Sequence, residues 1–206
     1  MTGMTGRAGM AAGDTATPAA GGQMGTTIVV VGPSGAGKDS VMGYAARHFS
    51  GDERFVFARR VITRPSDAGG EAHIGVDAAT FARMKDEGSF CVSWEAHGLS
   101  YGVPAEVQAQ IARGAVAIVN GSRQALPALV AAFPRLKVVT ITAHAEVRAE
   151  RLARRGRESG DAIAGRLDRQ PRGPDMDLDQ VIIDNSGALE TAGTAFVRLL
   201  DQTVES

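Results

Sequence analysis

The chain has 206 residues, which is enough for one well-buried domain and too few for two domains of typical size. Hydrophobic residues make up 44% of it and charged residues 22%, as in ordinary globular proteins, and the formal net charge of -1 excludes a global basic field that would attract nucleic acid. No apolar run approaches the roughly 20 residues of a membrane span, and the single cysteine, Cys91, excludes an intramolecular disulfide. We therefore expect a cytoplasmic protein that binds neither nucleic acid nor membranes, with Cys91 as a buried structural thiol.

Residues 1–25 differ in composition from the rest of the chain. They are rich in Gly, Ala, Thr and Met and lack the hydrophobic stretch of a signal peptide. A segment of this kind buries too little apolar surface to offset the entropy lost on folding. We expect a disordered tail over 1–25 and one folded domain over 26–206.

A glycine-rich segment follows the first apolar run of this domain. Residues 26–31 predict a buried strand, and the spacing Gly-x-x-x-x-Gly-Lys comes next, just before a predicted helix. Glycines let successive backbone N–H groups point at one anion, the helix N-terminus adds partial positive charge, and Lys38 adds a full charge. This context favours a phosphate-binding loop for ATP over a plain glycine-rich turn. The expected loop is Gly32, Pro33, Ser34, Gly35, Ala36, Gly37 and Lys38.

The residue after Lys38 is Asp39, where a P-loop normally has Ser or Thr to ligate magnesium through a hydroxyl. A carboxylate is also a good ligand for magnesium, but it adds negative charge beside the phosphates. Two alternatives follow. Either Asp39 is directed toward the metal, with Ser40 beside it, or it caps the start of the helix and pairs with an arginine.

Strands and helices alternate along the rest of the sequence. Apolar runs predict strands at 55–58, 90–94, 115–119, 136–142 and 181–184. Apolar residues at helical spacing predict helices at 41–49, 78–86, 105–113, 124–133, 145–155 and 188–200, and a loop is expected at 65–75. The alternation predicts an α/β fold with a parallel sheet, and ligands at the carboxyl ends of its strands.

Five arginines lie between positions 148 and 157, on and just after the predicted helix 145–155. One interpretation is a solvated helix with i,i+4 ion pairs, each contributing about 0.3–0.5 kcal/mol. The other is a lid that closes over a triphosphate and stabilises charge that develops during transfer. Because a phosphate loop is already present, we favour the lid. Its expected members are Arg151, Arg154, Arg155 and Arg157.

A second group of polar residues follows the strand 55–58. Arg60 and Arg64 are suited to bind phosphate oxygens through their planar guanidinium groups, and Tyr101 can donate its hydroxyl to a phosphate or simply pack. A phosphate acceptor is already deprotonated near neutral pH, so the reaction needs alignment and charge neutralisation and no general base. We accordingly expect His73 and His97 to be structural.

The order of these motifs resembles the guanylate kinase group of nucleoside monophosphate kinases. The resemblance extends over nearly all of the chain from residue 26 onward. Its motifs are the P-loop at 32–38, an acceptor loop at 63–71, a tyrosine-containing strand and turn at 95–102, a lid at 154–156 and a last strand at 181–185. It implies a P-loop NTPase fold with a parallel sheet flanked by helices, an acceptor-binding segment and an Arg-rich lid.

Several parts that read guanine in that group are absent here, whereas the parts that bind phosphate remain. Ser66 and Asp67 stand where a second acceptor arginine is expected, and the guanine-reading glutamate is replaced near Val92. The motifs at 32–40, 62–64, 73–76, 93–103 and 119–123 instead resemble the ribose 1,5-bisphosphate phosphokinases of bacterial phosphonate catabolism. That resemblance implies transfer of the ATP γ-phosphate to the 1-phosphate of ribose 1,5-bisphosphate, which gives 5-phosphoribosyl 1-diphosphate. The alternatives are a divergent guanylate kinase and a non-catalytic interaction domain.

The resemblance also assigns expected roles. Lys38, Arg151 and Arg155 are the expected catalytic residues, with Arg154 and Arg157 on ATP and with Asp39 and Ser40 on the magnesium side. The expected acceptor-binding residues are Arg60, Arg64, Glu71, Tyr101, Asn120, Ser122 and Arg123. Among these, Asn120 and Ser122 are placed near ribose hydroxyls because they follow a predicted central strand.

Overall fold

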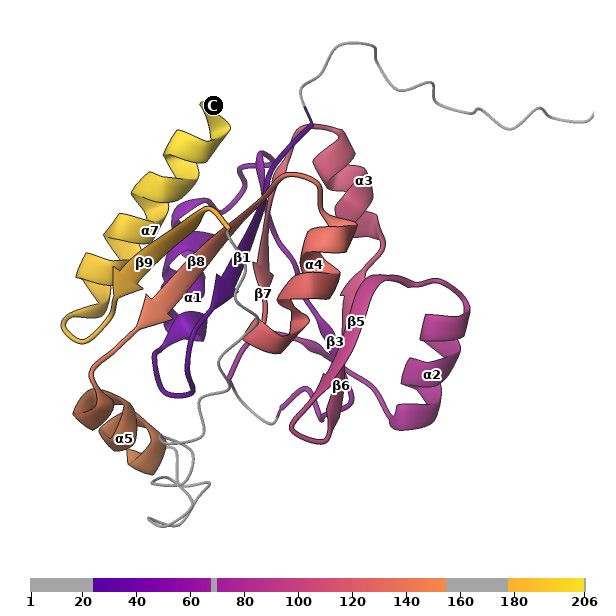
Figure 1. Ribbon diagram of the computed structural model, residues 1–206, viewed down its shortest axis with the longest axis horizontal. Coiled ribbons are helices and arrows are strands. Elements are labelled where there is room, and N and C mark those ends of the chain that lie inside the picture. The colour runs from indigo at the N-terminus through magenta and orange to yellow at the C-terminus, as the bar shows by residue number, and fades with distance from the viewer. Residues whose placement is uncertain (1–23, 68–69, 155–177, 206) are drawn as a thin grey trace, which may run out of the picture.

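A parallel sheet forms the centre of the domain in the computed structural model, which describes residues 24–67, 70–154 and 178–205. Its strand order is β2-β7-β1-β8-β9, and each neighbouring pair is parallel (Figure 1). The strands are β1 (Thr27–Val31), β2 (Phe55–Phe57), β7 (Val116–Asn120), β8 (Leu136–Thr142) and β9 (Gln180–Asp184). The predicted α/β fold with a parallel sheet is confirmed.

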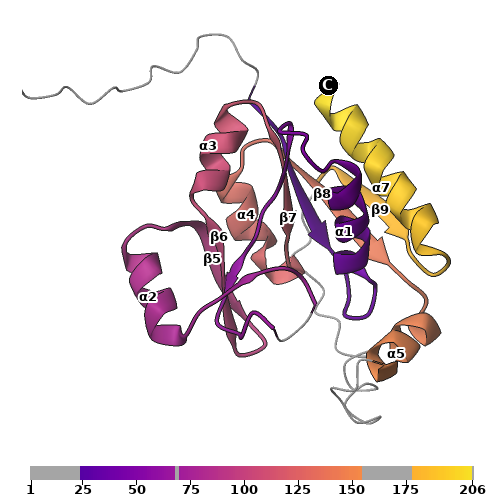
Figure 2. The same cartoon turned by 180° about the vertical axis from the view of Figure 1, so that it is seen from behind.

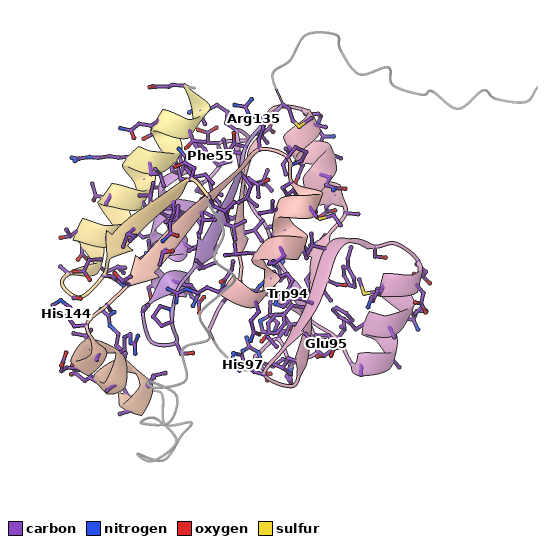
Figure 3. The ribbon with its side chains drawn as sticks, in the orientation of Figure 1. Phe55, Trp94, Glu95, His97, Arg135 and His144 are labelled. Carbon is purple, nitrogen blue, oxygen red and sulfur yellow. The ribbon has the colours of Figure 1, made fainter. Side chains whose placement is uncertain are left out.

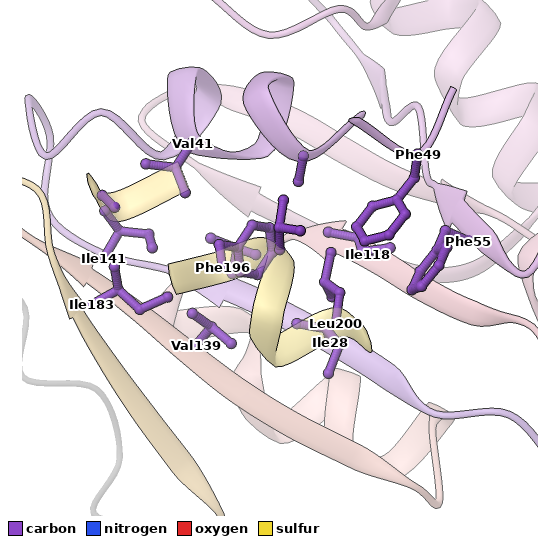
Figure 4. Packing of buried hydrophobic residues seen from close by; sticks show 14 of the residues in the cluster. Ile28, Val41, Phe49, Phe55, Ile118, Val139, Ile141, Ile183, Phe196 and Leu200 are labelled. Atoms are coloured by element: carbon purple, nitrogen blue, oxygen red, sulfur yellow. The ribbon is translucent and has the colours of Figure 1, made fainter. Parts of the chain in front are cut away.

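Helices cover both faces of this sheet (Figures 1 and 2). On one face lie α1 (Lys38–His48) and α7 (Leu189–Val204), and on the other lie α3 (Glu106–Ala112) and α4 (Leu126–Ala132). Because both faces are buried, β1 is apolar on both sides: Ile28 packs toward α1 and α7, and Val29 packs toward α3 and α4. In Figure 4, Phe196 and Leu200 of α7 lie against the strands, and both are fully buried.

A second, smaller sheet stands beside the carboxyl ends of the main strands (Figure 2). Its order is β4-β3-β6-β5, formed by β3 (Val61–Ile62), β4 (Ile74–Gly75), β5 (Phe90–Ala96) and β6 (Leu99–Pro104). The β3–β4 pair is parallel, and the other two pairs are antiparallel. The helix α2 (Ala78–Asp86) packs on it through Phe81, whose ring stacks on Phe90 at 4.8 Å between centroids.

Part of this second sheet differs from the sequence-based expectation. The loop predicted at 65–75 ends in β4, and the strand predicted at 90–94 continues to Ala96. Strand β3 was not predicted, and β6 was expected only through the tyrosine-containing strand and turn at 95–102 that the resemblance implies. Two-residue strands have no periodicity that a sequence can reveal, and they exist here because the neighbouring strand supplies their hydrogen bonds.

Most other elements agree with the predicted ranges to within a few residues. The predicted helix 124–133 is divided into a 3-10 turn, η1 (Arg123–Ala125), and α4, because Ser122 caps the turn through a bond from the Ala125 amide. The last helix extends to Val204, and α5 (Ala145–Arg154) occupies the described part of the predicted helix 145–155.

The first described residues are attached to the domain. Gly25, which we assigned to the tail, donates its N–H to the Ile111 carbonyl at 2.9 Å, and the Met24 carbonyl accepts a bond from Arg135 at 2.9 Å. Residues 1–23 lie outside the described part. Within that part, no helix is long and apolar enough to cross a membrane.

The hairpin between β5 and β6 turns through two residues with positive φ. His97 has φ 53° and Gly98 has φ 72°, and the flanking Ala96 and Leu99 are paired. Positive φ at both central positions defines a type I′ turn, whose twist suits a hairpin. Figure 3 shows His97 at the tip, beyond Trp94 on the same hairpin. His97 therefore has a structural position, as predicted.

We expect His97→Val to destabilise the protein by about 1–2 kcal/mol, because a β-branched residue is strained at positive φ. His97→Asn, which tolerates this conformation, should change the free energy of unfolding by less than about 0.5 kcal/mol. Urea denaturation of the three proteins measures the difference. Equal midpoints for the Val and Asn variants would contradict the turn assignment.

Candidate active site

The glycine-rich loop joins the end of β1 to the first residue of α1. Gly37 precedes the helix with φ 84°, and a Cβ placed on it would lie 2.4 Å from Nδ2 of Asn185. Only glycine fits there without displacing Asn185. Lys38 begins α1, and its Nζ donates to the Gly32 carbonyl at 3.0 Å. The lysine side chain therefore turns back toward the start of the glycine-rich loop. The predicted strand, glycine-rich turn and helix are confirmed.

The Ala36 carbonyl in this loop receives two side-chain hydrogen bonds. Asn185, just after β9, donates to it from Nδ2 at 2.8 Å, and Arg151 of α5 donates from Nη1 at 3.4 Å. Asn185 is only 2% exposed. We did not predict a role for Asn185, although its place after a strand that ends at the loop's edge of the sheet was a usable signal.

The arginines of α5 occupy three different environments. Arg148 is 6% exposed, and its backbone carbonyl would lie 2.8 Å from a Cβ on Gly35, so α5 lies directly against the loop. Arg151 reaches the Ala36 carbonyl, whereas Arg154 is exposed and pairs with Glu150 at 2.6 Å. Arg154 thus forms the i,i+4 ion pair of the solvated-helix interpretation. Arg155 and Arg157 lie outside the described residues, and their roles stay predictions.

Asp39 does not cap the helix, so the capping part of that alternative is wrong, whereas its pairing with an arginine stays a prediction. The N-cap is Gly37, which forms no side-chain capping bond, and Asp39 lies in the first turn. Its Oδ1 instead accepts a hydrogen bond from Nδ2 of Asn120 at 3.0 Å. A carboxylate in the first turn is stabilised by the helix dipole. Ser40, the other expected residue on the magnesium side, is exposed.

Arg60, an expected acceptor-binding residue, is buried, and its guanidinium has several neighbours. Its guanidinium forms a two-point ion pair with Glu71, with Nε 3.2 Å from Oε2 and Nη2 bonded to Oε1. It also lies 4.9 Å from the ring centroid of Tyr101 and 5.5 Å from that of Trp94, and these two rings are stacked. Arg60 and Tyr101 therefore lie side by side, as expected. The guanidinium of Arg60, however, is already paired with the Glu71 carboxylate.

Arg64 lies close to the first turn of α1. A Cβ on Gly70 would lie 3.8 Å from Nη2 of Arg64 and 3.6 Å from Oδ2 of Asp39, so these two groups flank the same residue. His73 is 2% exposed, and its Nε2 is 3.2 Å from the Pro65 carbonyl. The imidazole thus holds the segment between β3 and β4, which is the structural role we predicted.

The remaining expected acceptor residues lie near the carboxyl end of β7. Asn120 is its last residue and is 4% exposed. The Ser122 hydroxyl accepts from the Ala125 amide at 3.2 Å, which gives it a capping role in η1. Arg123 is partly exposed, and its backbone carbonyl accepts from the Leu126 amide, while no hydrogen bond or ion pair of its side chain occurs among the described residues.

The half-buried thiol of Cys91 contributes no nucleophile. Burial raises its pKa to about 11, and Sγ donates to the carbonyls of Val103 and Pro104, each at 3.5 Å. A thiol with this pKa is almost fully protonated near neutral pH and therefore unreactive. The predicted structural role is confirmed.

Comparison with solved structures identifies the class. The chain is similar to guanylate kinase from Anaplasma phagocytophilum with a TM-score of 0.65 and 16% sequence identity, over 90% of this chain and 89% of that one. At that identity the likeness concerns the fold alone. With the strand, glycine-rich loop and Lys38 of β1–α1, it defines a P-loop protein with the guanylate kinase fold.

Comparison with curated sequences is more specific. The chain is 53% identical to the ribose 1,5-bisphosphate phosphokinase PhnN of Rhizobium etli over 89% of its own length and 93% of the relative. It is 52% identical to the protein of that name from Agrobacterium fabrum, over 87% of this chain and 98% of the relative. The chain belongs to the ribose 1,5-bisphosphate phosphokinase family. No protein-family model matches it.

Asn185→Asp should weaken ATP binding and raise the KM for ATP by about 10-fold or more. The substituted side chain is the same size, but it places a buried carboxylate against the Ala36 carbonyl, where the amide now donates. Steady-state kinetics with varied ATP measure the effect. Gln180→Glu, the same change at an exposed position of β9, is the control and should leave the KM for ATP unchanged. Equal KM values in both variants would contradict the role given to Asn185.

Proposed function

We propose that this protein transfers the γ-phosphoryl group of ATP to the 1-phosphate of ribose 1,5-bisphosphate. The bond between the γ-phosphorus and the bridging oxygen of ADP breaks, and a bond forms between that phosphorus and an oxygen of the 1-phosphate. The products are ADP and 5-phosphoribosyl 1-diphosphate. The observation that carries the proposal is 53% identity, over nearly the whole chain, to a relative named for this kinase activity, with the phosphate loop and Lys38 intact.

The donor side of the proposed reaction is the loop from Gly32 to Lys38. Backbone N–H groups, the start of α1 and the Lys38 ammonium together favour the β- and γ-phosphates of ATP. Lys38 would exchange its bond to the Gly32 carbonyl for phosphate oxygens, because an ammonium bonds more strongly to an anion. Arg151, already at the loop, is suited to neutralise charge that develops on the transferred group.

The residues at the start of α1 fit a magnesium ion. Asp39 offers a carboxylate, the preferred ligand type, and its hydrogen bond from Asn120 uses Oδ1, while Oδ2 faces the neighbourhood of Gly70. When bound, magnesium neutralises phosphate charge and orients the triphosphate. We propose that Asp39 contributes to holding it, and that Ser40 contributes little because it is exposed.

The acceptor side is the second sheet with the segment between β3 and β4. Arg64 is the favoured ligand of an acceptor phosphate, because its cationic group flanks Gly70 together with Asp39 and so lies beside the donor side. Tyr101 packs against Trp94 and Arg60, which leaves its hydroxyl as the polar end of a rigid group. An acceptor phosphate needs no base, which agrees with the structural roles of His73 and His97.

A GMP kinase activity is less well supported. The position at which we expected a guanine-reading glutamate carries Val92, which is 5% exposed and packs in the core between the two sheets. A buried valine offers no hydrogen bond to a base. Identity to the guanylate kinase of similar fold is 16%, against 53% to the relative from Rhizobium etli.

The direct test is ADP release with ATP and magnesium, with ribose 1,5-bisphosphate or GMP as the acceptor. We expect turnover with the sugar bisphosphate and none above background with GMP. Mass spectrometry of the product should show the added phosphoryl group on the sugar. Turnover with GMP alone would overturn the proposal.

Lys38→Ala should lower kcat with ribose 1,5-bisphosphate by at least about 100-fold, since it removes a fixed positive charge at the transferred group. Thermal unfolding should change by no more than about 2 °C, because Lys38 is partly exposed and outside the core. An active Lys38→Ala protein would mean that the loop does not hold the donor phosphates.

Asp39→Ser restores the residue type usual at this position of a P-loop and tests the proposed metal role. We expect the magnesium concentration for half-maximal activity to shift by about 5-fold or more, because a hydroxyl replaces a carboxylate. Calorimetric titration of the wild type and Asp39→Ser with ATP, with and without magnesium, compares the magnesium dependence of ATP binding in the absence of turnover. An unchanged magnesium requirement would remove Asp39 from the metal side.

A further inference from the structure

One amide joins two carboxylates that come from separate parts of the fold. Nδ2 of Asn120, at the end of β7, donates to Oδ1 of Asp39 at 3.0 Å and to Oε2 of Glu71 at 2.9 Å. Asp39 belongs to the first turn of α1, and Glu71 belongs to the segment between β3 and β4. Asn120 is therefore the point at which the phosphate loop's helix and the acceptor segment meet.

The chemistry of the site fixes which way this amide points. An Asn side chain has two N–H hydrogens, and each carboxylate here takes one of them. The opposite orientation would place the amide oxygen against two anions. Asn120 is 4% exposed and the Glu71 side chain is 15% exposed, so water cannot readily replace these bonds.

The charges around the amide differ on its two sides. Glu71 is neutralised by the buried guanidinium of Arg60, whereas Asp39 has the N-terminal end of α1 and the guanidinium of Arg64 nearby. Without a donor between them, the two carboxylates would repel each other at short range. The amide gives each carboxylate a hydrogen-bond donor and so offsets this repulsion.

We propose that Asn120 is a positioning residue that holds the Asp39 carboxylate toward the donor side and the Glu71 carboxylate toward Arg60. Both amide hydrogens are engaged in this role, so the amide oxygen is the atom that remains for the expected contact with ribose hydroxyls. A continuous set of contacts then runs from α1 through Asn120, Glu71 and Arg60 to the stacked Trp94 and Tyr101. The positioning role itself does not depend on the proposed function, and only an effect of Asn120 on turnover would rest on that function.

The test is Asn120→Asp, which keeps the size of the side chain and removes the donor. Three carboxylates then face one another, and the Asp39 carboxylate loses its fixed position. We expect MgATP binding, measured by calorimetry without any acceptor, to weaken by about 10-fold or more at pH 8. Binding of ATP in the presence of a metal chelator should change by less than about 2-fold, because the phosphate loop itself is intact.

The comparison with and without magnesium separates positioning from simple packing. A variant that only loosened the fold would weaken the binding of MgATP and of metal-free ATP alike, whereas loss of the Asp39 position weakens MgATP binding alone. The groups that face this position are Asp39 and Glu71, with Arg60 and Arg64 next to them.

Two further variants complete the design. Gln124→Glu makes the same chemical change at an exposed position near the end of β7 and should bind MgATP like the wild type. Asn120→Ser keeps one hydroxyl donor and should give a smaller loss of MgATP affinity than Asn120→Asp. This variant keeps the positioning role testable even if the Asp variant folds poorly.

Wild-type affinity for MgATP in Asn120→Asp, or an equal loss of affinity for metal-free ATP, would overturn the inference. These binding measurements use no acceptor, so they are independent of the proposed reaction. A wild-type protein that fails to turn over ribose 1,5-bisphosphate while these affinity differences persist would overturn the proposed function and support the positioning role.

Discussion

The hydrogen bonds to the Ala36 carbonyl are the interaction on which the site depends. A glycine-rich loop has many conformations, and it binds a polyphosphate well only if one of them is already favoured. Here the Asn185 amide and the Arg151 guanidinium hold the middle of the loop from the end of β9 and from α5. The order of the main sheet thus determines the shape of the loop, because β9 must lie beside β8 for Asn185 to reach it.

The two sheets position different parts of the candidate site. The main sheet is buried on both faces and ends at the phosphate loop, whereas the residues proposed for the acceptor side include Arg60, just before β3, and Tyr101, in β6 of the smaller sheet. Strand β7 belongs to the main sheet, yet its last residue, Asn120, bonds to Glu71 of the acceptor segment. Buried polar contacts of this kind cost little only when every group has a partner, which constrains how the two sheets can sit relative to each other.

The parts of the fold that the sequence predicted are those with a long, regular apolar pattern. The runs at β1, β7 and β8 are buried on both sides, and such continuous apolar segments are recognisable without a structure. The strands β3 and β4 have two residues each, so their pairing arises from tertiary contacts that no local pattern reveals.

The candidate site likewise has parts that local sequence patterns predict and parts that only tertiary contacts determine. Motif spacing predicted the phosphate loop and Lys38, because these act through neighbouring backbone groups. It did not predict that Asn120 would bond to Asp39 or that Asn185 would bond to the Ala36 carbonyl. Those partners are 81 and 149 residues apart in sequence, and their meeting depends on strand order and not on local pattern.

The stacked pair of Trp94 and Tyr101 has a practical consequence. Trp94 is the single tryptophan of the chain, and its ring lies 5.5 Å from the Arg60 guanidinium that pairs with Glu71. Any ligand that draws Arg60 or Glu71 out of this arrangement changes the charge beside the indole. The protein therefore carries a built-in fluorophore at its proposed acceptor side, and its tryptophan emission, excited apart from the two tyrosines, reports on that side without a label.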